Sequence, residues 1–96
     1  MPKYVSLINL TDQGVRNLKD SPQRFEAFKE MAEKAGLKIE SVYYTQGQYD
    51  MAVILEGAED AAMVASLKLA SLGNARSQTM RAFSVDEMKG FLSKMP

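Results

Sequence analysis

Two segments of this chain alternate like β-strands but carry apolar side chains on both faces. Residues 3–10 and 49–56 each place apolar side chains at odd and at even positions. An antiparallel sheet that helices cover on one side normally alternates apolar and polar residues. Something must therefore cover the second face of this sheet, and a second copy of the chain is the simplest cover.

The length of the chain favours the same interpretation. With 96 residues, the chain is expected to form a single domain, residues 1–96. Domains near this size bury only about two-thirds of the surface that the unfolded chain exposes, so association adds needed stability. We therefore predict a homodimer or a higher multiple of dimers.

Composition argues against several classes of function. Lys plus Arg and Asp plus Glu balance at 12 each, which offers no field to attract nucleic acid or an anionic membrane. The chain has no cysteine and no histidine, so a Ser/His/Asp triad and thiolate or imidazole metal sites are excluded. We predict no nucleic-acid partner, no membrane partner, no metal and no cofactor.

Nothing in the sequence predicts export or insertion into a membrane. Residues 1–10 are too short and too polar for the apolar region of a signal peptide. No run approaches the ~20 apolar residues of a membrane span. A cytoplasmic location is the resulting prediction.

Periodicity and turn residues predict a regular order of elements. The expected order is a strand at 3–10, a short helical turn around 15–18, a helix from 21 to about 35, strands at 37–46 and 49–56, a helix from 59 to about 72, a strand at 76–83 and a C-terminal helix. Gln46-Gly47-Gln48 is expected to join the second and third strands as a hairpin. The helix from 59 is apolar around most of its circumference, which predicts burial on more than one side.

The ends of the helices carry recognisable signals. Ser21 is a plausible N-cap ahead of a proline, and Gly36 is expected to end that helix. Gly73 and Asn74 both tolerate positive φ and are expected to end the next helix. Residues 84–87 have the Ser-x-x-Glu spacing of a capping box.

This order predicts an α+β fold. Two strand-helix-strand halves joined by a hairpin form a ferredoxin-like βαββαβ sandwich, with a four-stranded antiparallel sheet and both helices on one face. The first and third strands are central in that topology, and they are the two strands that are apolar on both faces. Two such sheets packed face to face would form a dimeric α+β barrel with two internal clefts.

Four short segments, in this order and spacing, resemble the GYD-domain family of small bacterial and archaeal proteins. The likeness covers about residues 4–87, and it rests on the segments Leu10-Thr11-Asp12-Gln13-Gly14, Lys19-Asp20-Ser21-Pro22-Gln23-Arg24, Tyr44-Thr45-Gln46-Gly47-Gln48-Tyr49-Asp50 and Gly73-Asn74-Ala75-Arg76-Ser77-Gln78-Thr79. The resemblance implies the same ferredoxin-like, dimeric α+β-barrel fold. It implies no particular reaction.

Tyr49 and Asp50 are the candidates for catalysis. A carboxylate beside a cleft can act as a base when burial raises its pKa, and a phenol can donate to a developing oxyanion. Alternatively, Asp50 accepts hydrogen bonds from hairpin amides or pairs with Arg76, which would fix the strand register. The sequence leaves both interpretations open.

Further residues are candidates for ligand binding. Lys19 and Arg24 lie beside a helix N-terminus, where unpaired amides favour an anion, although nearby carboxylates are able to neutralise both cations. Tyr4 and Tyr44 add aromatic surface to the sheet, but the chain lacks the basic motif of an RNA-binding sheet. Arg76 and Arg81 each either enter a cleft or form a salt bridge across the dimer, and Arg81 shares a strand face with Thr79.

Three classes of function follow. We favour a homo-oligomeric module that binds a small molecule in an apolar cleft between sheet and helices, with Tyr49, Asp50 and Arg76 at the mouth. The first alternative is a cofactor-independent enzyme, resembling the monooxygenases and isomerases built on dimeric α+β barrels. The second alternative is a purely structural assembly protein.

Overall fold

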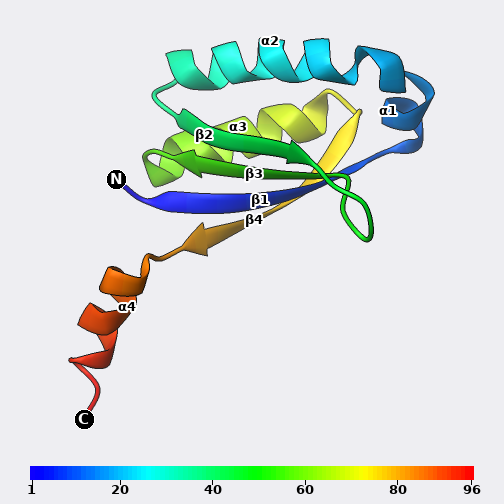
Figure 1. Ribbon diagram of the computed structural model, residues 1–96. Helices are drawn as coiled ribbons and strands as arrows, with labels where there is room; N and C mark the ends of the chain where they lie inside the picture. Colours follow the sequence, from blue (N-terminus) through cyan, green and yellow to red (C-terminus); the bar gives the residue numbers. More distant parts are fainter.

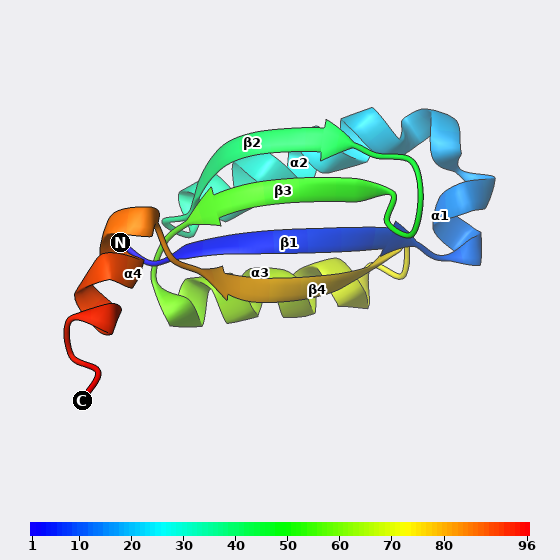
Figure 2. The same ribbon diagram turned by 60° about the horizontal axis from the view of Figure 1, so that its bottom comes forward.

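The computed structural model describes all residues, 1–96, and contains one four-stranded sheet with helices on one face (Figure 1). The elements are β1 (Lys3–Leu10), α1 (Asp12–Arg16), the 3₁₀ turn η1 (Leu18–Asp20), α2 (Ser21–Lys34), β2 (Lys38–Tyr44), β3 (Met51–Glu56), α3 (Glu59–Ser71), β4 (Ala75–Ala82) and α4 (Val85–Leu92). The strands are antiparallel throughout and are arranged in the order β2-β3-β1-β4 (Figure 2). The predicted α+β fold, its βαββαβ order and the central positions of β1 and β3 are confirmed.

One face of the sheet packs against α2 and α3 and forms the core. Even-numbered residues of β1 and odd-numbered residues of β3 point to this side, and all of them except the half-buried Leu10 are buried. The buried apolar residues are Tyr4, Ile8, Ala32, Leu37, Met51, Val53, Leu55, Ala62, Ala65 and Ala75. The core is thin, since 14 of the 96 residues are buried and no large side chain is completely so.

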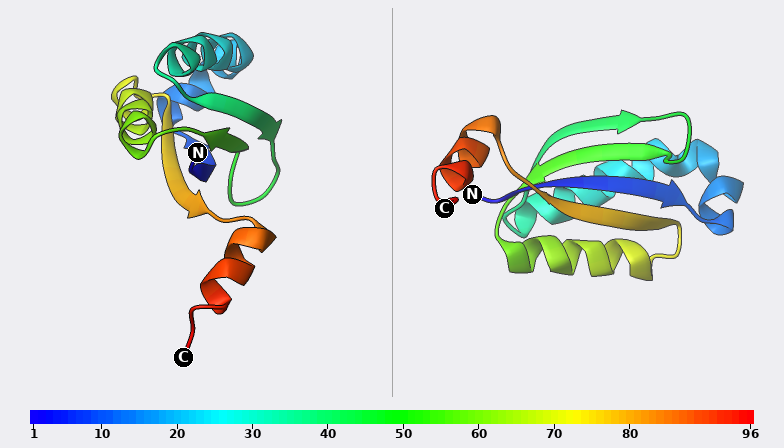
Figure 3. Two further views of the ribbon diagram at one scale, coloured as in Figure 1. Left: turned by 90° about the vertical axis from the view of Figure 1, so that its left-hand side faces the viewer. Right: turned by 90° about the horizontal axis from the view of Figure 1, so that it is seen from below.

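The other face of the sheet has no covering element (Figures 1 and 3). We call it the open face, and its apolar side chains lie next to one another in the strand register: Val5, Leu7, Tyr43, Ala52, Ile54 and Met80. Those on β1 and β3 are half-buried by their neighbours, whereas Tyr43 and Met80 are exposed. The predicted two-sided apolar sheet is confirmed, with its second side uncovered in the single chain.

The starts and ends of the two core helices follow the sequence signals in part. Gly36 and Gly73 adopt φ of 96° and 82° and end α2 and α3 as expected, and Asn74, which follows Gly73, keeps a negative φ. Ser21 is the first residue of α2 and not its cap, because its hydroxyl lies 2.9 Å from the Tyr44 hydroxyl across the gap to β2.

Helix α3 is covered on one side only, contrary to the prediction. Ala62 and Ala65 face the sheet and are buried. Met63, Val64 and Leu67 on its outer side remain exposed in the single chain.

The loop between β2 and β3 is wider than the expected three residues. It runs over residues 45–50, with the Thr45 amide donating to the Asp50 carbonyl at 2.8 Å and the Thr45 hydroxyl donating to the Tyr49 carbonyl. Gly47, at φ 108°, forms its tip. β3 therefore begins at Met51, two residues later than predicted.

Two of the sequence segments that carry the family resemblance meet at one junction. The Thr11 amide donates to the Asn74 carbonyl at 3.1 Å, and the Thr11 hydroxyl donates to the Gly73 carbonyl at 2.6 Å. Gly14 lies against the Asn74 carbonyl, where a Cβ atom would overlap the carbonyl oxygen. The junction joins the start of α1 to the turn before β4, which explains why a glycine occupies position 14.

The C-terminal helix α4 begins as predicted and leaves the domain. Ser84 and Glu87 form the expected capping box, with both hydrogen bonds at 3.0 Å. No residue of α4 is buried, and it projects away from the sheet (Figure 1). The radius of gyration, 14.8 Å, exceeds the ~12.5 Å expected of a compact domain of this length, which agrees with a projecting helix. No helix of the chain has the length and apolar character required to cross a membrane.

Candidate functional site

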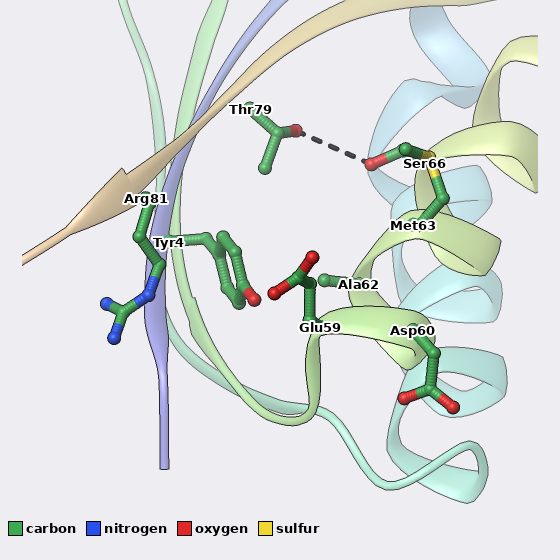
Figure 4. A pocket seen from close by; sticks show the side chains of 8 residues that line it. All are labelled: Tyr4, Glu59, Asp60, Ala62, Met63, Ser66, Thr79 and Arg81. Carbon is green, nitrogen blue, oxygen red and sulfur yellow. Dashed lines mark hydrogen bonds between the residues drawn. The ribbon is translucent and has the colours of Figure 1, made fainter.

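The most prominent hollow in the surface is an open cleft between α3 and the β4 edge of the sheet (Figure 4). Its volume is about 840 Å³, which lies in the range of small-molecule sites. Two strands and one helix line it, through Tyr4, Glu59, Asp60, Ala62, Met63, Ser66, Thr79 and Arg81. We call this hollow the α3–β4 cleft.

Tyr4 forms the floor of the α3–β4 cleft. Its side chain points from β1 to the helix-covered side of the sheet, and 7% of the residue is exposed. The Tyr4 hydroxyl is buried and has no hydrogen-bond partner. Figure 4 shows this hydroxyl pointing toward Glu59 and the α3 side of the cleft. Because buried polar groups are almost always paired, an unpaired hydroxyl here is an unused hydrogen-bonding position.

Arg81 lies on the other side of the Tyr4 ring from Glu59 (Figure 4). The strand register places it directly opposite Tyr4, and its guanidinium lies 5.8 Å from the Tyr4 ring centroid and 4.4 Å from that of Phe83. The guanidinium also donates to the carbonyls of Lys3, at 3.2 Å, and Ala82. These contacts fix Arg81 as a wall of the cleft, and both hydrogen bonds are made by Nη1.

The remaining lining combines apolar Ala62 and Met63 with polar side chains that mostly accept hydrogen bonds. Glu59 and Asp60 lie in the first turn of α3, where their charge complements the helix dipole. Deeper in the cleft, the Thr79 hydroxyl lies 3.0 Å from the Ser6 hydroxyl and 3.5 Å from that of Ser66. The cleft therefore offers two carboxylates, one guanidinium and several hydroxyls, a net negative lining.

The space between the sheet and the helices is largely filled. Two further cavities lie there, of about 30 and 60 Å³, and each is too small for more than a water or two. An apolar ligand cleft between sheet and helices was the prediction from sequence. The roomy space lies instead at the β4 edge.

Tyr49, Asp50 and Arg76, the predicted mouth of the cleft, lie away from it. The Tyr49 hydroxyl donates to the Gln78 side chain at 2.8 Å, and strand alternation places Gln78 and Arg76 on the open face. The Asp50 carboxylate accepts from the Leu10 amide at 2.8 Å and makes no salt bridge with Arg76. This bond joins the β2–β3 loop to the end of β1, and its donor is neither a hairpin amide nor Arg76, the two partners expected from the sequence.

Lys19, Arg24 and Tyr44 lie near the start of α2, apart from the other predicted residues. Arg24 donates to the carbonyls of Asn17, at 2.6 Å, and Gly14, at 3.5 Å, and so satisfies groups near the end of α1. Lys19 is exposed on η1, and Tyr44 bonds Ser21 as described above. Among the seven predicted ligand-binding residues, Tyr4 alone lines the α3–β4 cleft, and the binding role of the other six stays a prediction.

Sequence reasoning did not assign Glu59, Asp60, Ser66 or Thr79 to a site, and it left Arg81 between a cleft and a salt bridge. The alternation of β4 did place Thr79 and Arg81 on one face. The missing information was the register between β1 and β4, which sets Ser6 opposite Thr79 and Tyr4 opposite Arg81. No group of three or more Asp or Glu side chains gathers in a way that would hold a metal ion.

Comparison with known proteins identifies the architecture. Residues 4–92 match the family model described as the GYD domain. The crystal structure of TTHA0845 from Thermus thermophilus is similar, with a TM-score of 0.52 and 23% sequence identity over 88% of this chain and 96% of that one. At this identity the likeness concerns the fold alone. No curated protein matches the chain.

Proposed function

This chain belongs to the GYD domain family, and we propose that it is a homo-oligomeric module that binds a small polar molecule in the α3–β4 cleft. The observation that carries the binding proposal is the buried Tyr4 hydroxyl without a partner. Leaving such a group unpaired costs about 1–3 kcal/mol, and a ligand that bonds to it recovers this cost.

The lining defines the chemistry of the ligand. Glu59 and Asp60 can only accept hydrogen bonds when ionised, and their two negative charges outweigh the single positive charge of Arg81. A ligand that donates hydrogen bonds, through an ammonium or hydroxyl group, is therefore favoured over an anion. Its donor would lie between the Tyr4 hydroxyl and the Glu59 carboxylate, and its apolar part against Met63 and Ala62.

The alternative of catalysis at Tyr49 and Asp50 gains no support from the structure. The Asp50 carboxylate is engaged by the Leu10 amide, and the Tyr49 hydroxyl by Gln78. Neither group is directed into the α3–β4 cleft.

The binding proposal is tested by ligand-observed NMR with a panel of small primary amines, polyols and size-matched carboxylates. We expect amines or polyols to bind the natural protein, and Tyr4→Phe to weaken that binding at least fivefold. Tyr49→Phe is the matched control, because it also removes one tyrosine hydroxyl, and it should leave binding unchanged. Equal binding by Tyr4→Phe would refute the role of Tyr4, and loss with Tyr49→Phe alone would move the site to the open face.

The homo-oligomer proposal is supported by the open face. Four strands at about 4.8 Å spacing and about seven residues at about 3.3 Å rise cover roughly 450 Å². Apolar side chains occupy the middle of this face, with polar and charged residues around them, and an apolar patch with a polar rim is typical of an interaction site. The thin core gives the same indication, since one covered side leaves only 14 residues buried. A second copy matches this surface in shape and polarity, because both sheets present the same apolar face.

Sedimentation velocity at micromolar concentration tests this second part. Leu7→Lys places a charge at the centre of the open face and should convert the dimer to monomer, because a buried unpaired ammonium is costly. Ala27→Lys, on the exposed side of α2, introduces the same charge and should leave the dimer intact. A Leu7→Lys protein that dimerises as tightly as Ala27→Lys would contradict the proposal.

A further inference from the structure

Helix α4 presents an apolar stripe that its own chain contacts only at Phe91 and otherwise leaves uncovered. The stripe follows helical spacing and consists of Val85, Met88, Phe91, Leu92 and Met95. All five side chains are exposed, from 46% at Phe91 to 75% at Val85. An isolated helix of eight residues is unstable in water, even with the capping box that starts it. The stripe therefore needs a packing partner if α4 is to persist.

The direction of α4 indicates where that partner lies. The helix leaves the end of β4 and extends to the side of the sheet opposite α2 and α3, beyond the open face (Figures 1 and 3). Phe91 packs edge-on against Phe83, with ring centroids 5.0 Å apart, which ties α4 to the residue after β4. A protein partner that covers the open face would therefore also lie beside α4.

We propose that α4 packs on a second copy of this chain and forms an exchanged arm of the interface. The inference rests on the proposed face-to-face dimer and adds to it. A standard stable interface buries about 800 Å² on each partner, and the open sheet face supplies only about half of this. Each α4 adds a stripe about 12 Å long and 10 Å wide, and each subunit both gives and receives one. With the two α4 helices included, the area buried on each partner comes close to that of a standard stable interface.

The charge of α4 argues against a membrane as the surface that covers its apolar stripe. Helices that lie on membranes carry Lys and Arg on their polar face. Here the segment of residues 85–92 has two acidic residues and one lysine, and Lys89 lies 4.0 Å from the Asp86 carboxylate. A second copy of the chain requires no basic face.

Two matched variants of the full chain test the arm. Met88→Glu adds a negative charge in the middle of the stripe, whereas Gly90→Glu adds the same charge on the opposite side, where a side chain meets nothing within 4 Å. Neither position is packed in the single chain, so both variants should fold. We expect the dimer dissociation constant, from sedimentation equilibrium, to rise at least tenfold for Met88→Glu and less than twofold for Gly90→Glu.

The outcomes separate the arm from the dimer itself. A dimeric natural protein with equal dissociation constants for both variants would overturn the arm and leave the sheet interface standing. A monomeric natural protein would overturn the dimer and the arm together.

Cross-linking shows directly which copy α4 contacts. The chain has no cysteine, so Met95→Cys accepts a single thiol-reactive benzophenone. ¹⁵N-labelled and unlabelled protein are mixed, equilibrated and then irradiated. We expect cross-linked peptide pairs in which one peptide is ¹⁵N-labelled and the other is not. Cross-links confined within single chains would mean that α4 folds back on its own open face, and would overturn the proposal.

Discussion

Removal of the Asp50 carboxylate should destabilise the fold without touching the ligand cleft. The Leu10 amide donates to this carboxylate at 2.8 Å in a half-buried position where β1 ends. Hydrogen bonds to charged groups contribute about 1.5–3 kcal/mol, and Asp50→Ala would leave the amide unpaired. We expect a loss of about 2 kcal/mol for Asp50→Ala. Asp50→Asn keeps an acceptor without the charge and should lose about half as much.

Urea unfolding at fixed protein concentration measures both losses, since dimerisation makes apparent stability depend on concentration. A domain of this size loses roughly 4–8 °C in Tm per kcal/mol, so Asp50→Ala should melt about 10 °C lower. Asp20→Ala is the control, because the Asp20 side chain caps no helix end. The structural account of Asp50 would be refuted by an Asp50→Asn protein of unchanged stability that no longer binds the ligand of the natural protein.

Three further predictions concern positions outside that loop. Gly14→Ala should cost about 2–3 kcal/mol in urea unfolding because the new Cβ overlaps the Asn74 carbonyl, whereas Gly90→Ala, in open space on a helix, should be neutral or stabilising. Tyr4→Phe should not destabilise the ligand-free protein and should raise its Tm, because it removes a buried unpaired hydroxyl; a lower Tm would indicate a hidden partner. A hydrogen bond from the Ser84 backbone amide, at the N-cap of α4, lowers the pKa of Glu87 below its ordinary value. The contribution of the Glu87 carboxylate to stability is therefore fully present above the ordinary pKa and is lost as the pH falls through the lowered pKa. Carboxyl ¹³C NMR should give a lower pKa for Glu87 in the folded than in the urea-unfolded chain, and equal values would contradict the capping box.

The parts of the fold that depend on local chemistry were predictable from the sequence. Strand β1 has the predicted bounds, since its alternating residues need no long-range information. Gly36 and Gly73 adopt positive φ, and the capping box of residues 84–87 forms as expected. Asn74 keeps a negative φ because the glycine before it already supplies the turn that ends α3.

The candidate site depended on the register between strands far apart in the sequence, which the sequence could not supply. Tyr4 and Arg81 meet because the register between β1 and β4 sets them opposite each other, and periodicity does not reveal that register. Tyr49 was placed at a cleft mouth from its position at a strand end, but its side chain crosses to Gln78. The apolar circumference of α3 predicted burial that the single chain does not provide, because a pattern reports apolar surface and not what covers it.

Native mass spectrometry of the freshly purified natural protein tests the central claim most directly, since one spectrum reports both the assembly and any retained small molecule. We predict a dimer, or a multiple of dimers, at micromolar concentration, with additional mass per subunit that Tyr4→Phe reduces. A spectrum of bare monomers would contradict both the covered open face and the occupied α3–β4 cleft.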